Sequence, residues 1–314
     1  MNNYSGNTPM VDITYKFNGN VSHIYAKLEY YNPSGSIKDR IASYIIDKAT
    51  ERGELKAGQP IVETTSGNTG IAAAAYGALT KHPVHIFMPD WTSTERVQLM
   101  KMYGANVHLV SKEENGFLGA LSQADQLVKE LNAFKINQFE NEDNIKAHYN
   151  STALEILKQL PDVTDFVSGV GSGGTIMGIG SRLKENNKTK LIAIEPDCNQ
   201  IIAGKKATRQ HKIEGIGDDF IPAILNTGII DQLIPINDDD AIAMASKLAK
   251  ELGLGVGISS GANFLGAVLA NNSNKKVVTV FADDNKKYLS TSLANPIASS
   301  DMLSNKIELL DVNY

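Results

Sequence analysis

One lysine stands where a helix is expected to begin, and an amine in that position has unusual chemistry. Residues 32–40, with the sequence NPSGSIKDR, follow a strand-like apolar stretch and precede an amphipathic helical pattern, which puts Lys38 near the first turn of the helix. The positive end of the helix dipole and burial both disfavour an ammonium ion, so the pKa of Lys38 would be lowered. A neutral amine can attack an aldehyde and form an imine. The alternative is an ordinary solvated lysine.

Three further loops carry polar and small residues just before predicted helices. Residues 63–70 (ETTSGNTG) offer hydroxyls, an amide and backbone N–H donors, which suit a carboxylate or a phosphate. Residues 168–175 (SGVGSGGT) combine the hydroxyl of Thr175 with glycines, which let backbone amides form a concave row around a dianion. In residues 257–262 (GISSGA) the serines could simply cap a helix. The first two of these loops therefore predict anion binding.

The glycine-rich loop also permits a different interpretation. Gly169, Gly171 and Gly174 have the spacing G-x-G-x-x-G of dinucleotide-binding enzymes. Glu195 follows Gly174 by 21 residues, where an acid would bind the ribose. A nicotinamide-dependent dehydrogenase is therefore an alternative, although it leaves the two earlier loops without a role.

These loops require a framework in which strands end and helices begin near one another. Stretches of helical period, such as residues 38–50 and the segment after Asp238, alternate with short β-branched runs at residues 23–28, 60–63, 84–88, 165–167, 190–194 and 276–281. This alternation predicts parallel sheets with helices on both faces, which bind ligands beyond the carboxyl ends of strands. A chain of 314 residues is expected to form two unequal lobes.

Composition argues against several classes of protein. The net charge is −5, with 30 Lys and Arg residues against 35 Asp and Glu residues, so nucleic-acid binding is not expected. The longest apolar run, residues 71–79, is far too short to span a bilayer, and the N-terminus does not resemble a secretory signal. The one cysteine, Cys198, excludes an intrachain disulfide, and the histidines lack zinc-ligand spacing. A cytoplasmic protein without a metal, a nucleic-acid partner or membrane attachment is expected.

In their order along the chain, the four loops resemble the signature of the cysteine synthase and cystathionine β-synthase family of pyridoxal-phosphate enzymes. The resemblance covers nearly the whole chain and extends to Met88-Pro89, Glu95-Arg96 and Gln138-Phe139. It implies a homodimer of α/β chains with the two-domain fold of the tryptophan synthase β-subunit, in which each domain is a twisted, mostly parallel sheet flanked by helices. Residues 35–142 would form the smaller domain that closes on the substrate, and residues 1–34 with 143–314 the larger domain that binds the phosphate.

The resemblance also implies a role for individual residues. Lys38 would hold pyridoxal 5'-phosphate as an internal aldimine and then remove the α-proton of the substrate. Asn68 would lie beside the ring oxygen of the cofactor and Ser259 opposite its pyridine nitrogen. The phosphate would be bound by Gly171, Ser172, Gly173, Gly174 and Thr175. The substrate carboxylate would be bound by Thr65, Ser66, Thr69 and Gln138.

The implied reaction is β-replacement at an amino acid through an aminoacrylate, first of all the synthesis of cysteine and acetate from O-acetylserine and sulfide. Cystathionine synthesis, or a desulfhydrase or lyase reaction on cysteine or serine, ranks second. Residues 215–222 (GIGDDFIP) look nearer to cystathionine β-synthase and predict that Asp219 faces the second substrate, with a solvated carboxylate as the alternative. Thr64 and Ala282 replace prolines that are usual in the family. A dehydrogenase and a partner-binding protein of low turnover are more distant alternatives.

Overall fold

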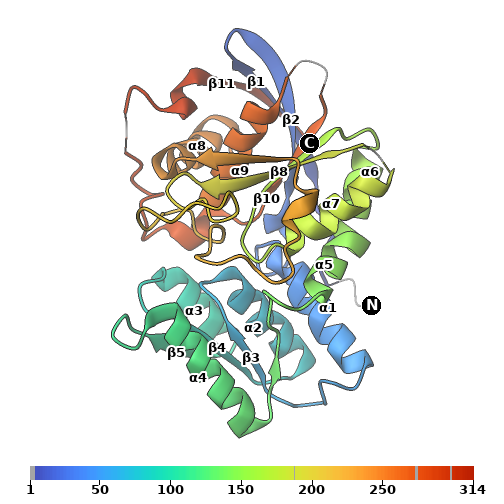
Figure 1. Cartoon of the computed structure of the whole chain (residues 1–314), viewed down its shortest axis with the longest axis vertical. Coiled ribbons are helices and arrows are strands. Elements are labelled where there is room, and N and C mark those ends of the chain that lie inside the picture. Colours follow the sequence, from blue (N-terminus) through green and yellow to red (C-terminus); the bar gives the residue numbers. More distant parts are fainter. Residues whose placement is uncertain (1–3, 187, 273–274, 298) are drawn as a thin grey trace.

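The computed structural model describes residues 4–186, 188–272, 275–297 and 299–314, and these form two lobes with one sheet each (Figure 1). The sheet of the larger lobe has the strand order β11-β1-β2-β10-β7-β8-β9, and that of the smaller lobe has the order β5-β4-β3-β6. The predicted α/β fold class is confirmed. Within the described residues no helix is long and apolar enough to cross a membrane.

The sheet of the larger lobe is parallel except at one edge. Its parallel strands are β2 (Asn20–Leu28), β10 (Val277–Phe281), β7 (Asp165–Gly169), β8 (Lys190–Pro196) and β9 (Gln232–Ile236). β1 (Met10–Phe17) is antiparallel to both β2 and β11 (Ile307–Asn313). The β1–β2 hairpin turns at Asn18 and Gly19, whose φ angles of 50° and 82° are those of an Asn-Gly hairpin turn.

Helices cover both faces of this sheet. One face packs against α7 (Gly174–Asn186), α6 (Ala153–Gln159) and their neighbour α5 (Asp143–Ala147), with a π-helical turn at His148–Thr152 between α5 and α6. The other face packs against α8 (Asp238–Leu252) and α9 (Ile258–Ala270). Short 3-10 turns lie at Glu29–Tyr31, Thr227–Ile229, Asn285–Tyr288 and Leu303–Lys306. The buried residues of the sheet's parallel strands are mostly apolar, and the exceptions are Lys27, Asp165, Ser168, Glu195 and Thr279.

The smaller sheet is parallel throughout. Its strands are β3 (Ile61–Thr64), β4 (Val84–Pro89), β5 (Asn106–Val110) and β6 (Phe134–Lys135). One apolar cluster joins this sheet to α1 (Lys38–Glu51), α2 (Asn68–Thr80) and α3 (Thr94–Met102). A second cluster joins its other face to α4 (Gly116–Leu131). α1 therefore connects the lobes, since it leaves the larger lobe and packs with the smaller one (Figure 1).

The predicted elements are confirmed in type and position. The six β-branched runs form β2, β3, β4, β7, β8 and β10, and the two helical patterns form α1 and α8. The carboxyl ends of β3 and β7 lead directly into the helices α2 and α7, which is the arrangement that the alternating pattern predicts. The antiparallel edge formed by β1 and β11 was outside that prediction.

Candidate active site

A cavity of about 1040 Å³ opens where the four predicted loops meet. The helices α1, α2, α7 and α9 each begin at this cavity, so the positive ends of four helix dipoles converge on it. Almost all of the predicted site residues line it, namely Lys38, Thr65, Ser66, Asn68, Thr69, Gln138, Gly171, Ser172, Gly173, Thr175, Asp219 and Ser259. Gly174 does not line the cavity and packs against Asn144.

Lys38 is the first residue of α1 and lies in the wall of the cavity. Burial lowers the pKa of its ammonium group, and the opposing influence of the nearby Asp218 and Asp283 carboxylates is smaller. The residue before it is fixed by a backbone hydrogen bond from Ile37 N–H to the carbonyl of Ala282, at 2.8 Å. The predicted lowering of the Lys38 pKa is therefore found, with burial as its main cause.

A buried ion-pair network secures the first turn of α1 just beyond Lys38. Arg40 Nε donates to Glu29 Oε2 at 2.6 Å, and Arg40 Nη1 donates to Glu155 Oε1 at 2.8 Å. Lys27 Nζ completes the network with a 2.7 Å contact to Glu155 Oε2. The network contains two positive and two negative side chains, so its charges balance in the interior. It ties α1 to β2 and α6, which are elements of the larger lobe.

The loop after β3 presents hydroxyl and amide groups at the N-terminus of α2. Thr69 Oγ1 donates to Gln138 Oε1 at 2.7 Å, and Gly67 N–H donates to Thr65 Oγ1 at 3.1 Å. Gly67 has no substitute here, because a Cβ atom would lie 2.4 Å from Cδ of the buried Arg96. The loop thus carries unpaired backbone donors and oriented hydroxyls, a suitable receptor for a carboxylate.

The glycine-rich loop, residues 168–175, leads into the N-terminus of α7 and forms a compact cradle for an anion. Gly173 has a φ of 89°, and a Cβ atom on Gly171 would lie 2.4 Å from the carbonyl oxygen of Gly215. Asn144 supports the cradle, since its Nδ2 donates to Ser172 Oγ at 2.9 Å and to the carbonyl of Gln138 at 2.8 Å. Backbone amides at a helix N-terminus with glycines of this kind form an anion site that suits a phosphate.

A third group of side chains joins the lobes across the cavity. Asn68 Nδ2 and the hydroxyl of Tyr288 both donate to Asp283 Oδ2, each at 2.7 Å. Arg96 stacks on the ring of Tyr288 with 4.4 Å between the guanidinium carbon and the ring centroid. Ser259 lies nearby in the first turn of α9, where it is buried and lines the cavity. One N–H of the Asn68 amide remains available to a ligand.

These features fit pyridoxal phosphate. An amine of lowered pKa and a phosphate cradle face the same cavity, which is large enough for the cofactor together with an amino acid. The dinucleotide interpretation lacks comparable support, because Glu195 accepts hydrogen bonds from the backbone of Ile202 at 2.7 Å and Ala203 at 3.2 Å and does not line the cavity.

Of two adjacent aspartates, only the second was predicted to belong to the site. Asp218 and Asp219 both line the cavity. Asp219 is exposed and accepts a 3.0 Å hydrogen bond from Asn199 Nδ2, whereas Asp218 lies close enough to Lys38 for each to shift the pKa of the other. The contact of Asp219 with a second substrate stays a prediction. Asn144 was also missed, and Arg96 and Asp283 were given no role in the site, since an isolated polar residue does not reveal its partner in a single sequence.

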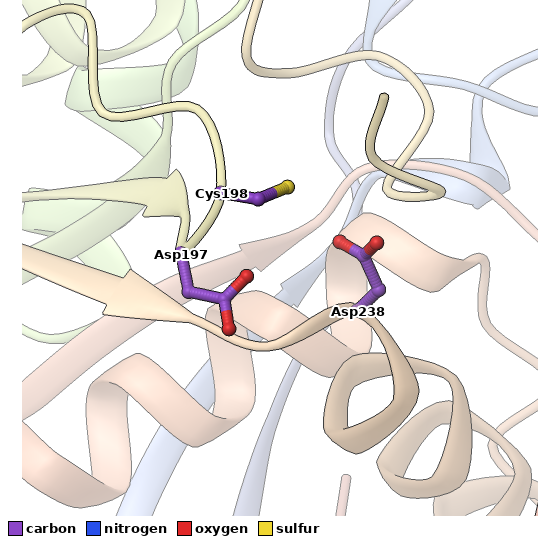
Figure 2. A group of neighbouring side chains, drawn as sticks. All are labelled: Asp197, Cys198 and Asp238. Atoms are coloured by element: carbon purple, nitrogen blue, oxygen red, sulfur yellow. The ribbon is translucent and has the colours of Figure 1, made fainter. Parts of the chain in front are cut away.

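Asp197, Cys198 and Asp238 form a separate cluster (Figure 2), with one ligand-type atom of each within 4.8 Å of the others. Its carboxylates already have a cationic partner, because Arg209 contacts Asp238 at 2.5 Å and Asp197 at 3.3 Å. Burial raises the pKa of the Cys198 thiol, which disfavours the thiolate that metals bind. The cluster is therefore an ion-pair site with a passive thiol.

The chain is similar in sequence and in structure to known proteins. The family model described as pyridoxal-phosphate dependent enzyme matches residues 1–283. A cysteine synthase of Staphylococcus aureus is 41% identical over 294 residues, which are 92% of this chain and 94% of that protein. The crystal structure of a hydrogen sulfide-producing enzyme from Fusobacterium nucleatum is 45% identical and superposes with a TM-score of 0.95, covering 99% of this chain and 96% of that one. A cysteine synthase structure from Entamoeba histolytica is 37% identical with a TM-score of 0.87, covering 96% and 92%.

Proposed function

The chain belongs to the family of pyridoxal-phosphate dependent enzymes, and on that premise we propose that it makes cysteine and acetate from O-acetylserine and sulfide. Its chemistry is pyridoxal-phosphate dependent β-replacement at an amino acid. The observation that carries the proposal is the position of Lys38, an amine of lowered pKa in the same cavity as a phosphate cradle and a carboxylate receptor.

Lys38 would bond to the cofactor aldehyde, and the amides of residues 171–175 with the Thr175 hydroxyl would bind its phosphate. When bound, pyridoxal phosphate withdraws electrons from Cα of the attached amino acid, which permits loss of the α-proton and then of the β-substituent. Ser259 would offer a neutral hydroxyl to the ring nitrogen, which would not hold a proton there as an aspartate would. Asn68 would donate its free N–H to the ring oxygen.

The loop after β3 would bind the substrate carboxylate. Ser66 and the hydroxyls of Thr65 and Thr69 lie at the N-terminus of α2, and Gln138 already accepts from Thr69. Because this loop belongs to the smaller lobe, a carboxylate bound there would draw residues 35–142 toward residues 1–34 and 143–314. Such closure expels water and fixes the direction of the α-hydrogen.

Lys38 would also move the proton. Once released from the cofactor, its neutral amine can accept the α-proton, and the lowered pKa favours that neutral, basic form. Asp218 would stabilise the ammonium ion that results, since the two groups influence each other electrostatically. Lys38 is then the acid that returns a proton to Cα when the product forms.

A second function is favoured by one observation. The hydrogen sulfide-producing enzyme of Fusobacterium nucleatum superposes on 99% of this chain. Release of sulfide from cysteine uses the same loss of an α-proton and a β-substituent, with sulfide as the leaving group. We rank it behind synthesis from O-acetylserine. We also propose that the chain acts as a homodimer in the cytoplasm, which sedimentation and cell fractionation would test.

Visible spectra and product analysis test the proposed function together. The purified protein should be yellow, and its absorption band should shift when O-acetylserine is added. Addition of sulfide should then produce cysteine and restore the first band. If cysteine alone gives the shift and releases sulfide while O-acetylserine does neither, the second function replaces the first. A protein that takes up no pyridoxal phosphate would refute both.

A further inference from the structure

Three phenylalanines from distant parts of the chain form a row at the cavity. Phe117 lies on α4 of the smaller lobe, Phe139 follows β6, and Phe220 lies in the segment between β8 and β9 of the larger lobe. The ring centroids of Phe117 and Phe139 are 6.3 Å apart at an interplanar angle of 89°, and those of Phe139 and Phe220 are 5.0 Å apart at 68°. Both contacts have the edge-to-face geometry that aromatic rings favour. The row therefore connects the two lobes.

The row lies at the rim of the cavity. All three rings line it, and Phe220 is 38% exposed, whereas the polar residues Ser172 and Gln138 in the same lining are 5% and 4% exposed. The backbone supports this position, because Ile224 N–H donates to the carbonyl of Phe139 at 3.4 Å and so ties the second phenylalanine to the segment that carries the third. Phe117 and Phe139 are half-buried and Phe220 is exposed, so the row extends from the cavity lining to the solvent.

We infer that Phe117, Phe139 and Phe220 form a gate that favours a thiol over water as the second reactant. The inference rests on the proposed function. Loss of the α-proton and the β-substituent leaves an unsaturated three-carbon unit in the site. A thiol adds its sulfur to the β-carbon, and a proton goes to the α-carbon, which gives the replacement product. Water instead hydrolyses the carbon–nitrogen bond, which gives pyruvate and ammonia. Neither path requires an oxidant or a reductant.

The gate acts through two physical properties of the rings. The rings contact one another along the cavity lining and leave little polar surface there to support a chain of water molecules into the cavity. Sulfur is polarisable and makes favourable contacts with aromatic edges, so a thiol or hydrogen sulfide passes such an opening more readily than water. Because Phe117 and Phe220 belong to different lobes, the row is complete only while the lobes remain close together.

The ratio of pyruvate to replacement product, measured with the enzyme that has bound pyridoxal phosphate, tests the gate. Phe220→Ala and Phe117→Ala should each raise the ratio of pyruvate to replacement product by about two- to tenfold, the range that the loss of one aromatic pair supports. Leu131→Ala is the matched control, since Leu131 is an exposed apolar residue at the other end of α4 and does not line the cavity. This control should leave the ratio unchanged.

A second measurement needs no turnover. Trp91 is the only tryptophan of the chain, lines the cavity, and lies against the start of α4, where its Cη2 atom would be 2.8 Å from a Cβ on Gly116. Trp91 is 44% exposed, so acrylamide already quenches part of its fluorescence in the cofactor-free wild type; the quenching should be stronger in Phe117→Ala and unchanged in Leu131→Ala. Failure of the proposed function would abolish the product ratios but leave this readout intact.

Phe220→Leu keeps the proposal falsifiable if an alanine variant does not fold. Leucine retains an apolar side chain but removes the edge-to-face contact, so the ratio of pyruvate to replacement product should rise less than in Phe220→Ala, in the same direction. The gate is refuted if folded variants at Phe220 and Phe117 keep the wild-type product ratio. It is equally refuted if the ratio rises by the same factor in Leu131→Ala.

Discussion

Glu155→Gln should destabilise the protein strongly at neutral pH and much less in acid. Glu155 accepts hydrogen bonds from Nη1 and Nη2 of Arg40, each at 2.8 Å, and contacts Lys27 at 2.7 Å, and its side chain is 17% exposed. Burial would raise the pKa of this carboxyl, but the hydrogen bonds and charges of Arg40 and Lys27 outweigh burial and lower the pKa from 4.5 to about 2.

The size of the effect follows from this pKa shift. A difference of one pKa unit corresponds to about 1.4 kcal/mol between the two protonation states, so the shift of Glu155 corresponds to about 3 kcal/mol of folding stability. Because the pKa is lower in the folded chain, this stabilisation is fully present above the unfolded pKa of 4.5 and is lost as the pH falls toward about 2. Glutamine keeps the shape of the side chain but cannot carry the charge.

Urea unfolding of the cofactor-free protein, followed by circular dichroism at a series of pH values, measures the effect. At pH 7 the free energy of unfolding should be about 3 kcal/mol lower in Glu155→Gln than in the wild type. The difference should shrink as the pH is lowered through the carboxyl range. Glu51→Gln is a matched control, because Glu51 pairs with Lys48 on the same helix as Arg40 but is 52% exposed, and exposed pairs contribute about 0.5 kcal/mol or less.

Two results would refute the reasoning. A loss below about 1 kcal/mol at pH 7 would mean that Lys27 and Arg40 are satisfied without Glu155. A loss that stays constant from neutral pH into acid would mean that the cost of the variant is one of packing rather than of charge.

Three more predictions concern the cavity. Gly174→Ala should weaken the binding of pyridoxal phosphate by about tenfold or more, because the new Cβ would lie 1.8 Å from Asn144 Oδ1. Titration of the cofactor-free protein measures this affinity. An affinity equal to that of the wild type would contradict the role of residues 171–175 in binding the phosphate. Asp283→Ala should cost about 1–3 kcal/mol in urea unfolding for each buried donor left unpaired, and an unchanged midpoint would show that water replaces the carboxylate. Asp218→Asn removes a carboxylate that raises the pKa of Lys38. Because the neutral amine of Lys38 forms the bond to the cofactor, cofactor uptake should reach half its maximum at a lower pH than in the wild type. A shift to higher pH would contradict the electrostatic pairing of Asp218 with Lys38.

Much of the cavity could be predicted from the sequence because its loops combine unusual residue types with a position before a helix. Glycine at 171 and 173, hydroxyls at 65 and 69, and a lysine at the start of a helix all have local physical reasons that a single sequence reveals. The structure then brings these loops together because parallel strands end at a common edge.

The residues that the sequence did not reveal act through partners distant in the chain. Glu155 meets Arg40 across 115 positions, and Asn68 meets Asp283 across 215, so no local spacing marks either pair. The choice between Asp218 and Asp219 depends on which side chain the loop turns toward Lys38, and adjacent identical residues give no sign of it. β11 pairs with β1 from the opposite end of the chain and was missed for the same reason, whereas β1 and β2 are joined by the Asn18-Gly19 turn, a local hairpin signal that was overlooked.

Chemical trapping of the cofactor tests the central role of Lys38 most directly. Borohydride reduction of the loaded protein makes the attachment permanent, and peptide mapping by mass spectrometry then identifies the modified lysine. We expect a single pyridoxyl group on the peptide that contains Lys38, and none in Lys38→Ala. Modification of a different lysine in the wild type, or no modification of a protein that has bound the cofactor, would contradict it.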